Sequence, residues 1–162
     1  PQRVTGLSLV ATTPRFVQAP DWSCAMPVET FEQFAAALHD DPDATLARFL
    51  ALQVKGAEHG RETLKLLRAE LQQRPSASEA GLAQGLDLLL RTDLRAGLER
   101  LACPSHWLFG SRDTLVPAAL QTQLRAYLPD ADIEHIAGAG HAPFLSHPYA
   151  SLDALMRTTG AI

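Results

Sequence analysis

Several features that define whole classes of protein are scarce in this sequence. The 162 residues include only two cysteines, Cys24 and Cys103, and they form no recognisable pattern. Two such cysteines are more often small buried side chains than a disulfide, and they fit a reducing compartment. The six histidines include no His-Glu-x-x-His pair, so we expect no metal. The sequence thus argues against a disulfide-stapled domain and against a metal enzyme.

Long apolar runs and a surplus of positive charge are missing as well. No apolar stretch approaches the roughly 20 residues that a membrane-spanning helix needs, and no signal sequence is recognisable. Lysine and arginine number 14 against 18 aspartates and glutamates, a net charge of -4, whereas nucleic-acid binding draws on excess positive charge. We expect a cytoplasmic protein with neither a membrane nor a nucleic-acid partner.

The composition is that of a folded chain, with 46% hydrophobic and 20% charged residues. An apolar run at 4–11 predicts a buried strand, which Pro14 ends. Strand and helix patterns then alternate toward the end of the chain, at 104–110 (strand), 116–128 (helix), 132–137 (strand) and 147–159 (helix). This alternation is typical of an α/β fold with a parallel sheet.

The block between these strands, residues 27–90, shows repeated helix boundaries. Asp41 precedes a proline as an N-cap does, Gly56 is expected as a C′ glycine, and Ser76 and Glu79 have capping-box spacing. We expect three or four helices here, with no strand among them. The predicted division is therefore a core at 1–20 and 95–162, and a helical lid at 21–94.

Two polar residues follow consecutive predicted strands. Asp113 comes after the strand at 104–110, and His141 comes after the strand at 132–137. Catalytic groups gather at the carboxyl ends of parallel strands, and an acid followed by a histidine is the order of the last two members of a hydrolase triad. Histidine can pass a proton to and from a hydroxyl while a carboxylate orients it. Taken singly, Asp113 could instead be a turn residue that caps a helix, and His141 a loop histidine.

The stretches FGSRDTLVP and GAGHAPFLSHP, with RFLALQ in the helical block, resemble the α/β-hydrolases and more narrowly the BioH family of pimeloyl-[acyl-carrier protein] methyl ester carboxylesterases of biotin synthesis. The resemblance runs over essentially the whole chain. It implies that Asp113 and His141 are the catalytic acid and base, that Phe49 lines an acyl tunnel, and that no cofactor is needed. It also implies docking of acyl carrier protein on basic residues of the lid, namely Arg48, Arg61 and Lys65.

The residues themselves leave the carrier interaction open. Arg61, Lys65 and Arg68 fall on one helical stripe, but glutamates at 58, 62 and 70 are interleaved with them. A mixed stripe of this kind is typical of a solvated helix face.

No nucleophile is recognisable in the 162 residues. Only Gly6–Val10 comes near the G-x-S-x-G pattern, and Val10 stands where a small residue is required, so Ser8 is rejected. By resemblance, the run at 4–11 is the sixth strand of the fold. We therefore expect the serine and both oxyanion donors to lie upstream of this chain, which alone is predicted to be inactive. Its first strand would expose an edge open to self-association or to an N-terminal fragment.

Two other interpretations remain at this level. The same acid and base serve other lidded α/β-hydrolases, including general carboxylesterases, C–C bond hydrolases and lactonases. A non-catalytic fragment that acts as an interaction module is the alternative outside enzymes.

Overall fold

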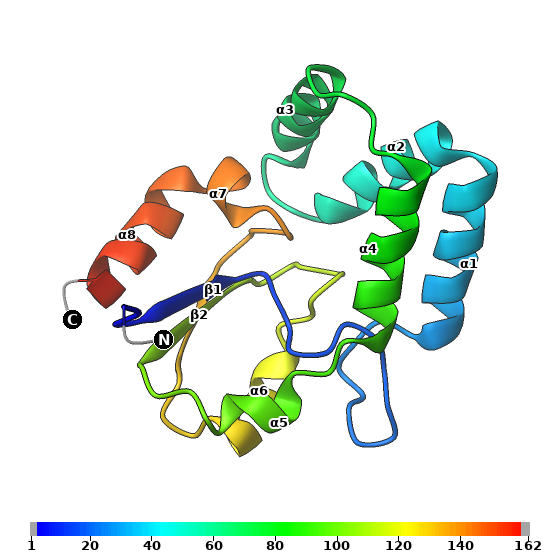
Figure 1. Ribbon diagram of the computed structural model, residues 1–162. Helices are drawn as coiled ribbons and strands as arrows, with labels where there is room; N and C mark the ends of the chain where they lie inside the picture. Colours follow the sequence, from blue (N-terminus) through cyan, green and yellow to red (C-terminus); the bar gives the residue numbers. More distant parts are fainter. Residues whose placement is uncertain (1–2, 160–162) are drawn as a thin grey trace.

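The computed structural model describes residues 3–159 and contains a parallel sheet with helices on both faces (Figure 1). The strands β1 (Leu7–Val10), β2 (Ser105–Gly110) and β3 (Asp132–Ile136) lie in the order β1-β2-β3, with β2 in the centre. Both strand pairs are parallel, and the predicted α/β class is confirmed.

Strand β1 is shorter than the apolar run that predicted it. The run spans 4–11, but the strand begins only at Leu7 and ends at Val10. Val4 is exposed, and Ala11 has a positive φ of 46°, which does not fit an extended strand. The strand is therefore limited to the residues that pair with β2.

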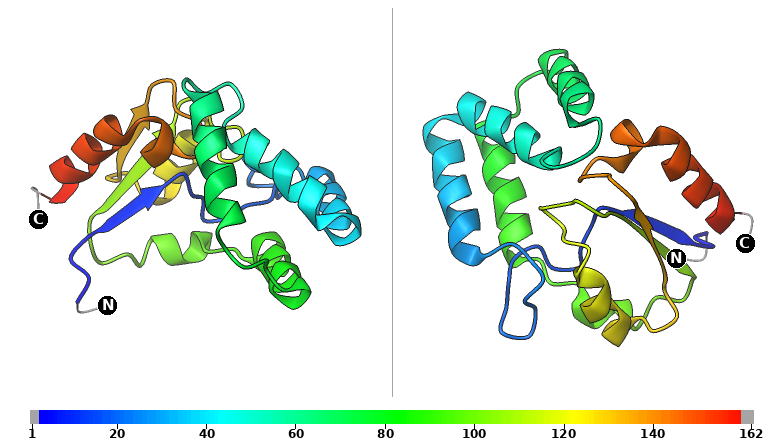
Figure 2. Two further views of the ribbon diagram at one scale, coloured as in Figure 1. Left: turned by 90° about the horizontal axis from the view of Figure 1, so that it is seen from above. Right: turned by 180° about the vertical axis from the view of Figure 1, so that it is seen from behind.

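Side chains of the central strand alternate between two cores. Trp107 and Phe109 pack with a cluster that includes Trp22 and buried leucines of α5 (Arg95–Leu98) and α6 (Leu120–Tyr127). Leu108 points to the opposite face, where it packs with Ala154 of α8 (Pro148–Thr159). Figure 2 shows the sheet between these two helical layers. Strand β2 is buried on both faces, as expected for a parallel strand.

Four successive helices stand beyond the carboxyl ends of the strands (Figures 1 and 2). They are α1 (Val28–Asp40), α2 (Pro42–Gln53), α3 (Gly60–Gln72) and α4 (Glu79–Arg91). No strand interrupts them within residues 28–91, as the sequence predicted. We refer to residues 28–91 as the four-helix segment.

The predicted N-cap of α2 is confirmed. The Asp41 carboxylate accepts a hydrogen bond from the Ala44 amide at 3.1 Å, and Pro42 is the first helical residue. The expected role of Gly56 as C′ residue is wrong, because α2 ends at Gln53 and Gly56 lies in the following turn with a φ of +73°. The glycine still serves a left-handed position, but in the connection to α3.

The predicted capping box of α4 is also wrong. The N-cap is Ser78, whose hydroxyl accepts from the Gly81 amide at 3.1 Å, and Glu79 is the first helical residue. Ser76 lies two positions too early, in the non-helical stretch before the helix. Two serines near one helix start made the boundary ambiguous in the sequence.

The helices in the last third of the chain have other bounds than the sequence patterns predicted. The amphipathic run at 116–128 becomes α6 only from Leu120, and the Val116 amide instead donates to the Asp113 carboxylate. A short helix, α7 (Pro143–Ser146), precedes α8 and was not predicted. Pro148 separates the two, since proline has no amide hydrogen and restricts the residue before it.

Ion pairs tie together the points where the chain leaves and re-enters the core. Arg15 binds Asp93 at 3.0 Å, and Arg95 binds both Asp21 at 2.9 Å and Asp93 at 2.7 Å. The Arg95 guanidinium holds the pKa of Asp93 well below its usual range. The Leu94 amide also donates to the Pro14 carbonyl at 2.9 Å. These contacts join the segment that leads into the four-helix segment to the segment that leads out of it.

Candidate active site

Asp113 lies in the turn that follows β2 and its carboxylate is fully buried. Oδ1 accepts hydrogen bonds from the Leu115 and Val116 amides at 2.8 and 3.0 Å. Oδ2 lies 2.9 Å from Nδ1 of His141, and none of the Asp113 side chain is exposed. One carboxylate oxygen of Asp113 thus stabilises the turn, and the other oxygen contacts the histidine.

His141 follows β3, and its side chain is partly exposed to solvent. The side chain is 26% exposed, and Nδ1 is the atom that meets the Asp113 carboxylate. A proton on Nδ1 donates to that carboxylate, which leaves Nε2 with a free lone pair. With the ring in this tautomer, Nε2 can accept a proton from a nearby hydroxyl.

The loops that carry the two residues are bonded to each other. The Arg112 amide donates to the Ala139 carbonyl at 2.9 Å, and the Ser111 amide donates to the Ile136 carbonyl at 3.0 Å. The Ser111 hydroxyl, in turn, accepts from the Gly138 amide at 2.9 Å. These contacts hold the loops of Asp113 and His141 at a fixed separation.

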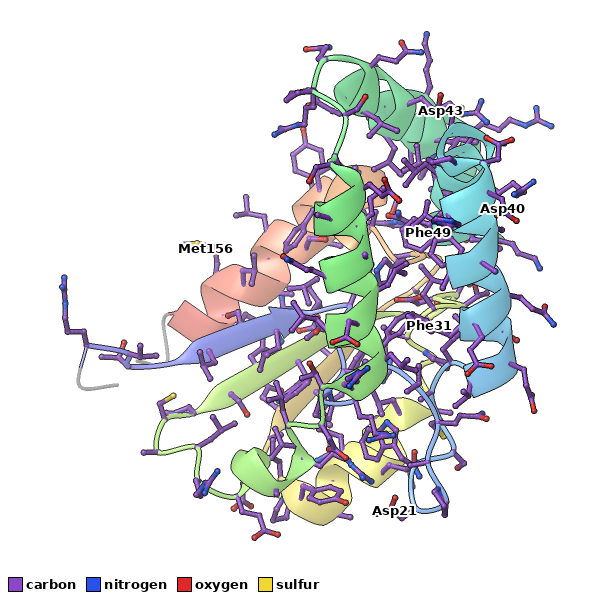
Figure 3. The ribbon with its side chains drawn as sticks, turned by 45° about the vertical axis from the view of Figure 1, so that its right-hand side comes forward. Asp21, Phe31, Asp40, Asp43, Phe49 and Met156 are labelled. Carbon is purple, nitrogen blue, oxygen red and sulfur yellow. The ribbon has the colours of Figure 1, made fainter. Side chains whose placement is uncertain are left out.

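An apolar cavity of about 770 Å³ opens beside His141 and extends into the four-helix segment. The volume falls in the range of small-molecule binding sites. Phe31 and Phe49 lie in the region between α1 and α4 (Figure 3), and Phe49 packs against Phe34 with ring centroids 5.4 Å apart. Phe49, singled out from the sequence, does line this cavity, and so does Leu52.

Helix α4 supplies a large part of the cavity wall that sequence reasoning missed. Its residues on the lining are Gly81, Leu82, Gly85, Leu86, Leu88 and Leu89. The only sequence signal for this wall was the leucine-rich run of α4. In the structure Leu88 and Leu89 are 65% and 42% exposed, which ordinary core packing does not explain.

The three basic residues implied by the resemblance are all exposed. Arg61 and Lys65 lie on α3, whereas Arg48 lies on α2 and donates to the Thr45 hydroxyl at 2.9 Å. None of the three is among the residues that line the apolar cavity. Among residues 3–159, no group of three or more His, Cys, Asp or Glu side chains is placed to hold a metal ion.

The geometry does not support Ser8 as a nucleophile. Ser8 lies inside β1 opposite His106 of β2, and no helix begins until Val28. A serine elbow requires a sharp turn between a strand and a helix.

No described helix has the length and apolar character to cross a membrane.

Solved structures share this architecture. An esterase from Exiguobacterium antarcticum matches with a TM-score of 0.78 at 19% identity, over 95% of this chain and 56% of the esterase. A bromoperoxidase from Bacillus anthracis matches with a TM-score of 0.75 at 21% identity, over 95% of this chain and 57% of its own. No family model matches the sequence. The chain shares the fold of these proteins, the α/β-hydrolase fold, and contains part of it.

The curated relatives define a narrower class of protein than the solved structures do. A protein of Xanthomonas oryzae pv. oryzae named pimeloyl-[acyl-carrier protein] methyl ester esterase is 46% identical over 160 residues, which is 99% of this chain and 63% of the relative. A protein of the same name from Stenotrophomonas maltophilia is 44% identical and is covered to 62%. The chain is similar to these esterases along nearly its whole length and spans somewhat less than two thirds of theirs.

Proposed function

We propose that this chain supplies the acid and the base of a Ser-His-Asp carboxylesterase. The observation that supports the proposal is the 2.9 Å contact between His141 Nδ1 and Asp113 Oδ2, beside an apolar cavity. The nucleophilic serine and the oxyanion donors come from protein outside these 162 residues. The four-helix segment acts as the lid over the site.

In this mechanism the serine hydroxyl attacks the ester carbonyl while His141 Nε2 accepts its proton. The tetrahedral intermediate collapses, and the imidazolium returns the proton to the departing methoxide, so that methanol leaves. Water then attacks the acyl-enzyme with His141 again as base, and the carboxylate product and the free serine result. Asp113 keeps the imidazole oriented and stabilises its positive charge. The reaction needs no cofactor.

The substrate we propose is the methyl ester of a pimeloyl chain on acyl carrier protein, as in the name of the relatives. The cavity suits the hydrocarbon part of such a chain, because the side chains that line it, Phe49 among them, are nearly all apolar. His141 is one of the residues that line the cavity, so an acyl chain bound there would bring its ester close to the proposed base. The proposed location of this biosynthetic reaction is the cytoplasm.

Docking of the carrier is proposed on the exposed basic residues Arg48, Arg61 and Lys65. An acidic carrier would be steered to this face, an effect that salt weakens. Reversing the charge of Arg61 and Lys65 should slow hydrolysis of a carrier-bound ester at low salt and leave a free methyl ester unaffected. Equal rates on the carrier-bound ester would reject the docking face.

The 162 residues alone are proposed to lack esterase activity, since loss of a serine nucleophile costs on the order of a million-fold in turnover. Strand β1 pairs only with β2 among the described strands, so its other edge is open to self-association or to a complementary fragment. Size-exclusion chromatography with light scattering tests this. A monodisperse monomer that melts cooperatively would favour the interaction-module alternative.

The decisive test replaces Asp113 by Asn in the enzyme that carries the complete triad. Hydrolysis of the methyl ester should fall by about ten-thousand-fold, the loss that the same change causes in a serine protease. Near-normal turnover would remove Asp113 from the mechanism. Comparison of methyl pimelate esters with short p-nitrophenyl esters separates this esterase from a general carboxylesterase, which would prefer the short esters.

A further inference from the structure

The connection between α2 and α3 lies directly against the loop that carries His141. The His141 amide donates to the Gln53 carbonyl at the end of α2, at 2.9 Å. The Glu58 amide donates to the Gly138 carbonyl at 2.8 Å. The backbone of the proposed base is therefore held by the four-helix segment as well as by the sheet.

Two glycines permit this close approach. A Cβ at Gly138 would lie 2.6 Å from the Glu58 carboxyl carbon, and a Cβ at Gly140 would lie 2.7 Å from the Gln53 carbonyl oxygen. Real Cβ atoms do not approach other heavy atoms so closely, and Gly138 also has a φ of +77°. The glycines before His141 thus make room for the α2–α3 connection.

Arg112 joins the same two parts of the protein through its side chain. Nη1 donates to the Gly56 carbonyl at 3.0 Å, and Nη2 meets Oε1 of Glu58 at 3.2 Å. Its backbone precedes Asp113 and is bonded to Ala139. The residue therefore connects the loop of the acid, the loop of the base and the α2–α3 connection.

Stability is a poor explanation for this arrangement. About half of each side chain is exposed, 49% for Arg112 and 54% for Glu58, and exposed ion pairs contribute little to stability. The contacts of Arg112 instead orient the α2–α3 connection relative to the loops of Asp113 and His141, because Arg112 makes two directed hydrogen bonds to the segment that begins where α2 ends. Helix α2 carries Phe49 and Leu52 into the cavity wall.

We propose that Arg112 and Glu58 are positioning residues that hold the end of α2 against His141 and so fix the cavity wall next to the imidazole. The inference rests on the proposed esterase function, in which that wall receives the acyl chain. Neither residue takes part in proton transfer. Their loss should weaken the use of long acyl chains more than the chemistry itself.

The test compares Arg112→Leu with wild type in the complete enzyme, on p-nitrophenyl octanoate and acetate. We expect KM for octanoate to rise about ten-fold, less than the hundred-fold that a displaced catalytic group can cost, and kcat for acetate to stay within about two-fold. Arg112→Lys should restore part of the octanoate KM, and Glu58→Gln should remain close to wild type because it keeps an acceptor oxygen. Arg74→Leu is the matched control, since Arg74 also forms an exposed ion pair, with Glu70 on α3.

A double variant, Arg112→Leu with Glu58→Ala, should be no worse than Arg112→Leu alone, because residues that act through one contact are not additive. Amide hydrogen exchange gives a readout without turnover: the amides of Glu58 and His141 should exchange faster in Arg112→Leu and unchanged in Arg74→Leu. Unchanged exchange at both amides would overturn the proposal, as would an equal loss of kcat on both esters. A wild-type enzyme without esterase activity would refute the proposed function instead, and the exchange rates would still decide the role of Arg112.

Discussion

Gly85 allows a direct test of whether the cavity holds an acyl chain. It lies in the middle of the α4 face that lines the cavity, and a Cβ at this position would meet no atom within 4 Å. Gly85→Phe should therefore place a ring in the cavity without a backbone clash. Glycine is a poor helix former, so the substitution should not weaken α4.

The size of the effect follows from burial of hydrocarbon. Each buried methylene contributes about 0.8 kcal/mol, which corresponds to about four-fold in kcat/KM. A phenylalanine ring that takes the room of about three methylenes should then cost about 2.4 kcal/mol, or roughly 60-fold, for the longest acyl chains. Chains that end before the ring should not be affected.

The assay measures kcat/KM over a series of p-nitrophenyl esters from acetate to decanoate. In wild type the value should rise with each added carbon until the cavity of about 770 Å³ is filled. In Gly85→Phe the rise should stop about three carbons earlier, with acetate unchanged. Gly85→Ala is the control: it should keep the wild-type profile and raise the free energy of unfolding by up to about 1 kcal/mol. The same chain-length profile in wild type and Gly85→Phe would refute the assignment of the cavity to the acyl chain.

Two further predictions concern stability. Asp41→Ala removes the N-cap of α2 and should lower the free energy of unfolding by about 1 kcal/mol, measured by urea denaturation; a change below about 0.3 kcal/mol would count against the cap. Burial of His135 lowers its pKa below the ordinary 6.5, so the fold favours the neutral ring, and stability should decrease as the pH falls below about 6.5 because the unfolded state binds the proton more readily. His135→Leu should reduce this decrease between pH 6.5 and 5, and an unaltered pH profile of the unfolding midpoint would contradict the role of His135.

The sequence predicted the sheet and the proximity of Asp113 and His141 because both depend on strong, local signals. Residues 104–110 and 132–137 were recognisable as strands, and adjacent parallel strands bring the residues after them, Asp113 and His141, to one edge. The contact of 2.9 Å between the two is the geometric consequence. The helix starts were less certain, since Ser76 and Ser78 both have the chemistry of an N-cap and only one is selected.

Other parts of the site depend on contacts between distant residues. Arg112 and Glu58 are 54 positions apart, and neither stands in a pattern that would indicate the other. The sequence of α4 is rich in leucine, but such a run does not tell whether its side chains meet a core or an open space. Only the packing of α4 opposite α1 and α2 shows that it surrounds a cavity.

Asp113 and His141 follow the two strands of one β2–α6–β3 unit, and this placement bears on how such a protein can change over evolution. Asp113 and His141 are separated by only 28 positions, and the four-helix segment is inserted between β1 and β2, outside that interval. Surface insertions of this kind are tolerated because chain-closure entropy grows slowly with length. Helices can thus be added to the four-helix segment without lengthening the stretch of chain that joins Asp113 to His141.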